Sequence, residues 1–138
     1  MDLFRPEMSV EELKAVSMLG LAHIGDAVYE LMTRTELCAA EGHTSVHELH
    51  RLSSSRVNAV SQAAAANIIQ PLLTEEERTV FRRGRNARVN SVPRASGVGQ
   101  YHAATGLEAL FGWLYLQGRT QRLSELFGAI NAALPGKD

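Results

Sequence analysis

Several features that define other protein classes are scarce or missing in this sequence of 138 residues. Its single cysteine, Cys38, rules out a disulfide within the chain and is typical of a reducing compartment. Because no partner residues stand at metal-ligand spacing, we expect Cys38 to be a small buried apolar residue. The N-terminus lacks the basic and apolar regions of a signal peptide, and no apolar run reaches the roughly 18 residues of a membrane span. We therefore expect a soluble cytoplasmic protein with no membrane partner.

Patterns typical of β-structure are also missing, since no segment alternates β-branched and polar residues and no hairpin signal occurs. Apolar residues recur at helical spacing along nearly the whole chain, which predicts an all-α fold. With 45% apolar residues, the chain is large enough for one hydrophobic core and too small for two. Residues 1–138 are therefore expected to form a single domain.

Local start and stop signals divide the chain into helices. Two capping boxes mark helix starts, one formed by Ser9 with Glu12 and one by Thr74 with Glu77. Helix-breaking residues are expected to end helices at Gly42, Pro71, Gly84 and Gly118. Together these signals predict helices over residues 9–17, 19–36, 44–50, 53–69, 74–83, 100–117 and 123–134. A long exposed loop is expected over residues 84–99.

Two of the predicted helices carry carboxylates among apolar residues. Asp26 and Glu30 are the only charged residues within 19–32, and Glu108 is the only Asp, Glu, Lys or Arg within 101–116. A buried carboxylate is costly unless it is neutralised, paired or bound to a metal. If the two helices pack together, their carboxylates converge in an apolar interior. Oxygen-rich sets of this kind suit Mg²⁺ or Mn²⁺.

Glycines beside these acids favour a close approach of the two helices. Gly25 precedes Asp26, and Gly106 and Gly112 flank Glu108. Glycine costs about 1 kcal/mol relative to alanine in a helix interior, so a packing or ligand reason is expected. The alternative is a structural ion-pair network, in which the two acids pair with Arg34, Arg51 or Arg56.

Positive charge is concentrated in one segment, although the formal net charge is −1. Residues 78–107 contain six arginines and no acid, whereas residues 1–77 hold twelve of the fifteen acids. Guanidinium groups without nearby acids are available to phosphate oxygens, which predicts binding to a nucleic acid backbone. Residues 84–99 contain no aromatic side chain, so a duplex is favoured over a stacked single strand. A solvated surface run is the alternative.

A divalent-metal site beside phosphate-binding arginines is the minimum equipment for phosphodiester hydrolysis, so the combination predicts a nuclease. Residues 24–30, Ile-Gly-Asp-Ala-Val-Tyr-Glu, resemble the signature helix of the ribonuclease III catalytic domain. Residues 107–116 resemble the second acidic motif of that family. The likeness is greatest to its short branch, Mini-ribonuclease III, which residues 21–26, 83–87 and 101–108 also resemble.

This resemblance implies a ribonuclease III-type homodimer with one site per protomer, each cutting one strand of double-stranded RNA. The expected substrate is precursor 23S large-subunit ribosomal RNA. Asp26 and Glu108 are implied to be catalytic and to hold Mg²⁺, for which Mn²⁺ can substitute, and Thr105 and Glu30 are candidates for water-mediated contacts. The candidate RNA-binding residues are Arg82, Arg83, Arg85, Asn86, Arg88 and Arg94.

The chain also departs from full-length ribonuclease III, where further acids stand at the positions of Leu19, Ala22 and Thr105. The site is therefore reduced. No double-stranded-RNA-binding domain is expected within residues 1–138, so the arginines would supply much of the RNA contact. Two rivals to a nuclease stay open. One is a catalytically silent RNA-binding or ribosome-assembly module of the same fold, and the other is an all-α interaction domain with a buried ion-pair network.

Overall fold

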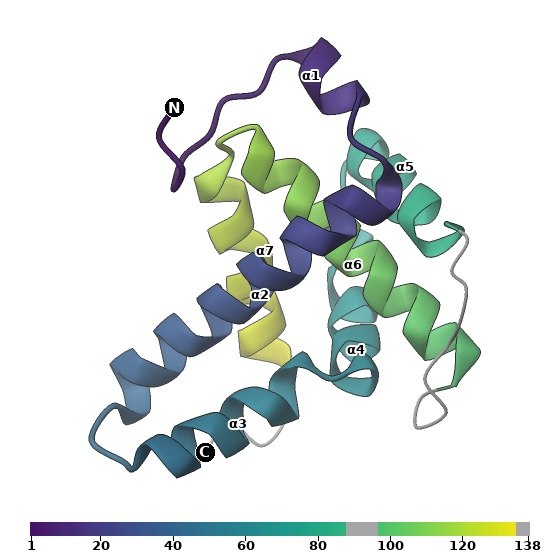
Figure 1. Cartoon of the computed structure of the whole chain (residues 1–138). Helices are drawn as coiled ribbons and strands as arrows, with labels where there is room; N and C mark the ends of the chain where they lie inside the picture. Colours follow the sequence, from purple (N-terminus) through teal and green to yellow (C-terminus); the bar gives the residue numbers. More distant parts are fainter. Residues whose placement is uncertain (88–96, 135–138) are drawn as a thin grey trace.

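A computed structural model describes residues 1–87 and 97–134 (Figure 1). All regular elements in these two ranges are helical, which confirms the predicted all-α fold. The α-helices are α1 (Val10–Lys14), α2 (Met18–Glu41), α3 (Val46–Val57), α4 (Ala59–Ile69), α5 (Glu75–Arg85), α6 (Val98–Leu116) and α7 (Thr120–Ala133). A short 3₁₀ helix, η1 (Gln70–Leu72), follows α4.

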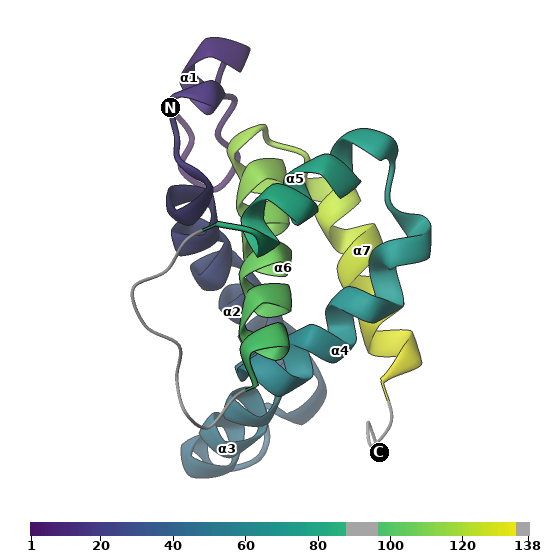
Figure 2. The ribbon, with the colours of Figure 1, turned by 90° about the vertical axis from the view of Figure 1, so that its right-hand side faces the viewer.

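Helix α6 forms the centre of the molecule. It packs against α2 on one side and against α4, α5 and α7 on the others (Figure 2). Every residue from Ala104 to Leu114 is buried except Glu108. The Tyr29 ring of α2 lies 5.2 Å from that of Phe111 in α6 and 5.5 Å from that of Phe127 in α7, both edge-on. Three helices therefore share one aromatic core.

Helices α2 and α6 cross with their backbones in contact. A Cβ atom on Gly25 would lie 1.6 Å from the Glu108 carbonyl oxygen, and one on Gly112 would lie 2.0 Å from the Leu21 carbonyl oxygen. No side chain fits at either position, so the crossing requires glycine in both helices. The predicted close approach at Gly25 and Gly112 is confirmed.

Helix α5 approaches α6 through another pair of glycines. The prediction that Gly84 ends its helix is wrong, because α5 continues to Arg85 and Gly84 is buried within it. A Cβ atom on Gly84 would lie 2.6 Å from the Ala109 Cβ, and one on Gly106 would lie 2.8 Å from the Phe81 carbonyl oxygen. Gly84 is therefore a contact residue and not a terminator.

Other boundaries also differ from the prediction. The break between α3 and α4 lies at Asn58, not within residues 50–53, because Asn58 has an extended backbone and its side chain caps α4 by accepting from Ser61 N. Helix α2 runs five residues beyond the predicted end at residue 36 and stops before Gly42. Both capping boxes and the end of α6 before Gly118, whose φ is +71°, are confirmed.

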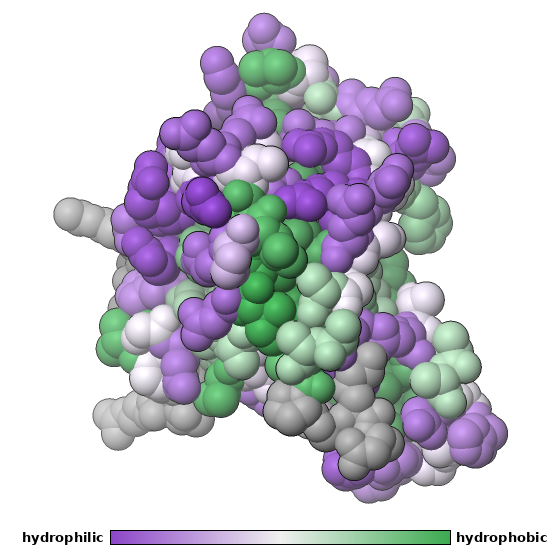
Figure 3. All heavy atoms as spheres, turned by 180° about the vertical axis from the view of Figure 1, so that it is seen from behind, coloured by the Kyte–Doolittle hydropathy of each residue, from purple (hydrophilic) through white to green (hydrophobic). Residues whose placement is uncertain are grey.

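The face opposite that of Figure 1 carries apolar side chains near its middle, bordered by hydrophilic ones (Figure 3). Within residues 1–87 and 97–134, no helix is both long and apolar enough to cross a membrane.

Candidate functional site

Asp26 and Glu108 meet where α2 crosses α6. Gly25, the neighbour of Asp26, contacts the Glu108 backbone, and the two carboxyl groups are close enough to share a hydrogen bond. Glu108 is half-buried, whereas Asp26 is exposed. The expected burial is therefore wrong for Asp26, because α2 turns an outward face to solvent that includes apolar residues such as Ala27 and Leu31. The predicted convergence of the two acids is nonetheless observed.

Within the described residues, no basic group offsets the negative charge of the pair. The pKa of the Glu108 carboxyl rises from 4.5 to about 8, first because it is buried and then because Asp26 is charged and hydrogen-bonded to it. The Gln62 amide acts in the opposite direction, and no basic side chain of the described residues lowers this pKa. Two neighbouring carboxyl groups of this kind form a natural position for a divalent cation.

The structural ion-pair alternative is contradicted. Each of the three arginines considered as partners pairs with a different acid: Arg34 with Glu30, Arg51 with Glu48 and Arg56 with Glu36. Asp26 and Glu108 form no ion pair within the part of the chain that the structure describes. No ion pair with a described residue therefore neutralises these two acids.

The donor set of the pair suits a hard divalent cation. Residues 1–87 and 97–134 contain no cluster of three or more His, Cys, Asp and Glu side chains that could hold a metal. Mg²⁺, however, is commonly held by only one or two carboxylates, while waters and substrate phosphates complete its coordination. Asp26 and Glu108 meet this minimum, and the exposure of Asp26 leaves one side open to water and substrate.

The two residues predicted to assist the pair have other partners. The Thr105 hydroxyl donates to the Tyr101 carbonyl oxygen at 3.0 Å, a common hydrogen bond of helical threonine. The Glu30 carboxylate, one turn beyond Asp26, pairs with Arg34 at 2.6 Å. The observed contacts thus link neither residue directly to Asp26 or Glu108.

Gln62 of α4 is a site residue that the sequence prediction missed. It is 2% exposed, and its side-chain amide reaches Glu108 and lowers the pKa of that carboxyl. Its Nε2 atom is buried and makes no hydrogen bond of ordinary geometry to the described residues. The only sequence signal is a lone amide side chain ahead of the alanine run 63–66.

The described part of the arginine cluster lies at the end of α5. Arg82, Arg83 and Arg85 belong to its last turn and Asn86 is its C-cap, and all four side chains are exposed. They lie on a helix end, whereas the sequence assigned Arg85 and Asn86 to a loop. None of the three arginines forms an ion pair with another described residue. Arg88 and Arg94 lie outside the described residues.

The arginine-bearing end of α5 is close to the carboxylate pair. Gly84, between Arg83 and Arg85, packs against Gly106 and Ala109 of α6. Ala109 directly follows Glu108 in that helix. The last turn of α5 therefore packs against α6 at the residue that follows Glu108.

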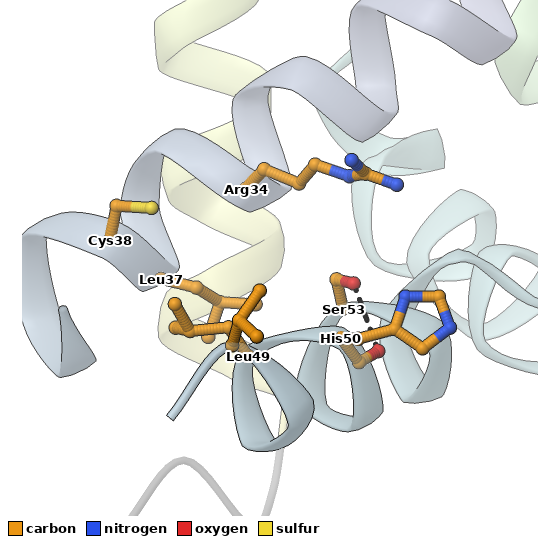
Figure 4. Close-up of a pocket in the computed structure, with 7 residues that line it drawn as sticks. Arg34, Leu37, Cys38, Leu49, His50 and Ser53 are labelled. Atoms are coloured by element: carbon orange, nitrogen blue, oxygen red, sulfur yellow. Dashed lines mark hydrogen bonds between the residues drawn. The ribbon is translucent and has the colours of Figure 1, made fainter. Parts of the chain in front are cut away.

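A separate pocket of about 210 Å³ lies between α2 and α3 (Figure 4). Its lining residues are Arg34, Leu37, Cys38, Val46, Leu49, His50 and Ser53, which include neither carboxylate of the pair. The Ser53 hydroxyl donates to the His50 carbonyl oxygen at 3.0 Å.

Cys38 is exposed, so its predicted burial is wrong. Helix α2 extends past Cys38 and turns the adjacent Leu37 inward instead.

Comparison with known proteins places both carboxylates inside a matched region. Residues 19–119 match the sequence profile of the family described as Ribonuclease III domain. The Mini-ribonuclease 3 of Symbiobacterium thermophilum is 45% identical over 111 residues, which are 80% of this chain and 85% of that protein. The Mini-ribonuclease 3 of Clostridium tetani is 39% identical over 120 residues, which are 87% and 80% of the two chains.

The fold is similar to a crystal structure of a Fusobacterium nucleatum protein. The TM-score is 0.79 at 28% sequence identity, and the match covers 87% of this chain and 97% of the other.

Proposed function

Because this chain belongs to the ribonuclease III family, in its Mini-ribonuclease 3 branch, and is an endoribonuclease, we propose that it uses a divalent metal ion to cut double-stranded RNA. One observation carries this proposal. Asp26 and Glu108 meet at the α2–α6 crossing with negative charge that no basic side chain of the described residues offsets. A site of this kind recruits positive charge from solution.

Asp26 and Glu108 hold Mg²⁺ in this proposal, and Mn²⁺ can take its place. A bound divalent cation supplies Lewis-acid stabilisation of a scissile phosphate and lowers the pKa of the attacking water. Glu108 anchors the cation from the half-buried side, while the exposed Asp26 faces the substrate. The glycine contacts between α2 and α6 fix the distance between the two helices and so preorganise the ligands.

RNA binds through its phosphate backbone to Arg82, Arg83, Arg85 and Asn86, together with Arg88 and Arg94. The exposure of the first four and their place beside α6 support this role.

We propose further that the enzyme is a homodimer, because a two-fold axis matches the antiparallel strands of a duplex and lets each protomer cut one strand. Double-stranded stems of precursor 23S ribosomal RNA in the cytoplasm are the proposed substrate.

The test is cleavage of a labelled RNA duplex by the wild type, Asp26→Asn and Glu108→Gln, each with Mg²⁺ and with EDTA. Loss of a metal ligand removes several kcal/mol of transition-state stabilisation, so each variant is expected to cut about 1000-fold more slowly or not at all. Both are expected to keep their helical content and their duplex affinity.

Glu125→Gln serves as the control, because Glu125 is an exposed acid on α7. It is expected to cut at the wild-type rate. An Asp26→Asn protein with normal activity would refute the metal assignment. A wild type that binds the duplex without cutting it would favour a silent RNA-binding module.

A further inference from the structure

We propose that a groove between α1, α2, α5 and α6 binds an unpaired nucleotide next to the RNA duplex, so that the chain prefers stems with a single-stranded flank to bare duplexes. The proposal rests on the function proposed above and names a finer class of substrate for it. The groove has a volume of about 550 Å³, a size typical of sites for small organic groups. Its lining includes neither Asp26 nor Glu108.

The inner part of the groove is apolar. Leu21 of α2, Val80 of α5 and Trp113 of α6 line it and are at most 9% exposed. Helix α1 adds the half-buried Leu13 and, at the outer edge, Val10, which is 62% exposed. Apolar and aromatic surface of this kind accepts a nucleic acid base, whose faces gain free energy when they leave water. The inner part therefore suits a base better than a phosphate.

Positive charge stands at two sides of this apolar surface. Lys14 lies in the last turn of α1 and Arg83 in the last turn of α5, and both side chains line the groove and are exposed. Neither forms an ion pair with a described residue. Glu76 is the one acid among the lining residues. Two cations beside an apolar surface suit a ligand that joins an apolar body to an anion, as a nucleotide does.

A polar side chain in the groove offers recognition of the base edge. Gln117, which follows α6, donates through Nε2 to the Trp113 carbonyl oxygen at 2.9 Å. This bond fixes the amide and leaves its Oε1 atom as an acceptor. An N–H group on the edge of a base can donate to that oxygen. The groove thus combines the three kinds of contact that a nucleotide needs.

Continuity with the arginines of α5 favours RNA over a protein segment as the occupant. Arg83 lines the groove and also belongs to the turn that carries Arg82 and Arg85. Trp113 follows Glu108 by five residues, about 8 Å along the axis of α6. An RNA bound at the carboxylate pair therefore extends close to the groove. A paired base stays in the stack, whereas an unpaired base can turn out of it and enter.

The test measures binding of three labelled RNAs in EDTA, so that none is cut. They share one duplex stem, which is blunt, carries a single-stranded flank, or carries an abasic flank of the same length that keeps the phosphates and lacks the bases. Fluorescence anisotropy gives the affinities. The fluorescence of Trp113, the only tryptophan of the chain, reports occupation of the groove.

The test variant is Val10→Glu, which places a negative charge at the edge of the groove, and Val46→Glu is its matched control. Both valines are exposed and begin a helix directly after a serine N-cap, α1 after Ser9 and α3 after Ser45. A glutamate in the first turn suits the dipole of either helix. The two variants therefore differ in the place of the added charge and not in its local effect.

The wild type is expected to bind the flanked stem roughly 5- to 10-fold more tightly than the blunt or the abasic one, the lower range for the stacking of one base. Only the flanked stem is expected to change the fluorescence of Trp113. Val10→Glu is expected to bind the flanked and blunt stems with equal affinity. Val46→Glu is expected to keep the preference of the wild type.

Equal affinity of the wild type for the flanked and abasic stems would overturn the proposal, and so would a folded Val10→Glu protein that keeps the full preference. If Val10→Glu does not fold, Lys14→Gln replaces it, with Arg78→Gln, an exposed cation of α5 outside the groove, as its control. A preference kept in Lys14→Gln would contradict the proposal equally. A change in Trp113 fluorescence with a glutamate-rich peptide, and with none of the RNAs, would assign the groove to a protein partner instead. If the wild type prefers the flanked stem but cuts no stem with Mg²⁺, the proposed function fails and the groove proposal stands.

Discussion

Two glutamates of this protein lose part or all of their contact with water on folding, and the groups around them shift their pKa values in opposite directions. Glu77 of α5 is fully buried, and Arg122 of α7 donates to both of its oxygens at 2.8 Å. This pairing lowers the pKa of Glu77. Glu108 of α6 is only half-buried, but its neighbour is a second carboxylate and its pKa rises to about 8.

The difference shows that burial by itself does not tell whether a carboxylate is paired within the chain. Glu77 also accepts from Thr74 N in the capping box, so its oxygens are engaged within the chain and its role is structural. Glu108 faces Asp26 and the neutral Gln62. The two glutamates differ in whether a described residue supplies a counter-ion.

The largest expected effect follows from removing the cation of the structural pair. Arg122→Met leaves Glu77 as a buried carboxylate without a counter-ion, which is expected to lower the free energy of unfolding by about 3–5 kcal/mol. Urea denaturation at pH 7 measures this loss. Arg34→Met, which breaks the exposed pair with Glu30, is expected to cost about 1 kcal/mol or less. Equal losses of unfolding free energy in Arg122→Met and Arg34→Met would mean that the buried pair of Glu77 stabilises the fold no more than an exposed pair does.

A change of pH is expected to have an intermediate effect on the free energy of unfolding, through Glu108. Glu108 binds its proton more tightly in the folded than in the unfolded state, so the free energy of unfolding decreases as pH rises from 4.5 to about 8. Glu108→Gln removes this slope and is expected to be more stable than the wild type at pH 8 by about 1–3 kcal/mol. Denaturation of both proteins across this range, without divalent cations, provides the measurement.

Glu77, which is paired with Arg122, is expected to give the opposite dependence of stability on pH. Because the pKa of Glu77 is lowered, its contribution is present above 4.5 and is lost as pH falls through the lower folded-state value. Glu108→Gln is therefore expected to keep the acid-induced loss of stability below pH 4.5. A wild type and Glu108→Gln with parallel curves from pH 5 to 8 would show that Glu108 titrates normally.

The smallest effect on stability is expected from the exposed arginines in the last turn of α5. Replacing Arg82, Arg83 and Arg85 by alanine is expected to cost about 1 kcal/mol or less, chiefly through the charge they place at the C-terminus of α5. Binding is expected to change more. Duplex affinity should fall, and the slope of its logarithm against log salt should flatten by roughly one unit for each lost phosphate contact.

Fluorescence anisotropy with a labelled duplex over a series of salt concentrations measures both binding quantities. A matched variant with alanine at Arg5, Arg34 and Arg51 removes the same charge from other exposed positions. Equal losses in the two triple variants would mean that net charge, and not the α5 arginines, sets RNA affinity.

Local signals in the sequence predicted that the helices exist more accurately than they predicted where each helix begins and ends. The capping boxes of α1 and α5 depend only on residues three apart, so the sequence contains all the information that they need. Gly84 was misjudged because glycine serves equally to end a helix and to admit a neighbouring one, and the choice depends on Ala109, which is distant in sequence. Asn58 was missed for a similar reason, since an asparagine cap resembles a residue of a continuous helix.

The candidate site was predictable where its residues belong to sequence motifs, and it was not predictable where its residues meet only through packing. Glu108 stands out as a lone acid among apolar residues, and Asp26 shares its apolar segment only with Glu30. The pairing of Glu77 with Arg122 joins residues 45 positions apart and has no sequence signal. Gln62 falls in the same class, because its effect on the pKa of Glu108 depends on the packing of α4 against α6.

The glycine contacts at the α2–α6 crossing also determine which motions can separate the two acids. Contacts made by side chains can loosen through rotamer changes, but Gly25 and Gly112 place backbone directly against backbone. The two helices also share the buried core around Tyr29 and Phe111. Local fluctuations of low free energy will therefore leave Asp26 and Glu108 together, and the opening that parts them coincides with cooperative unfolding of the helical core.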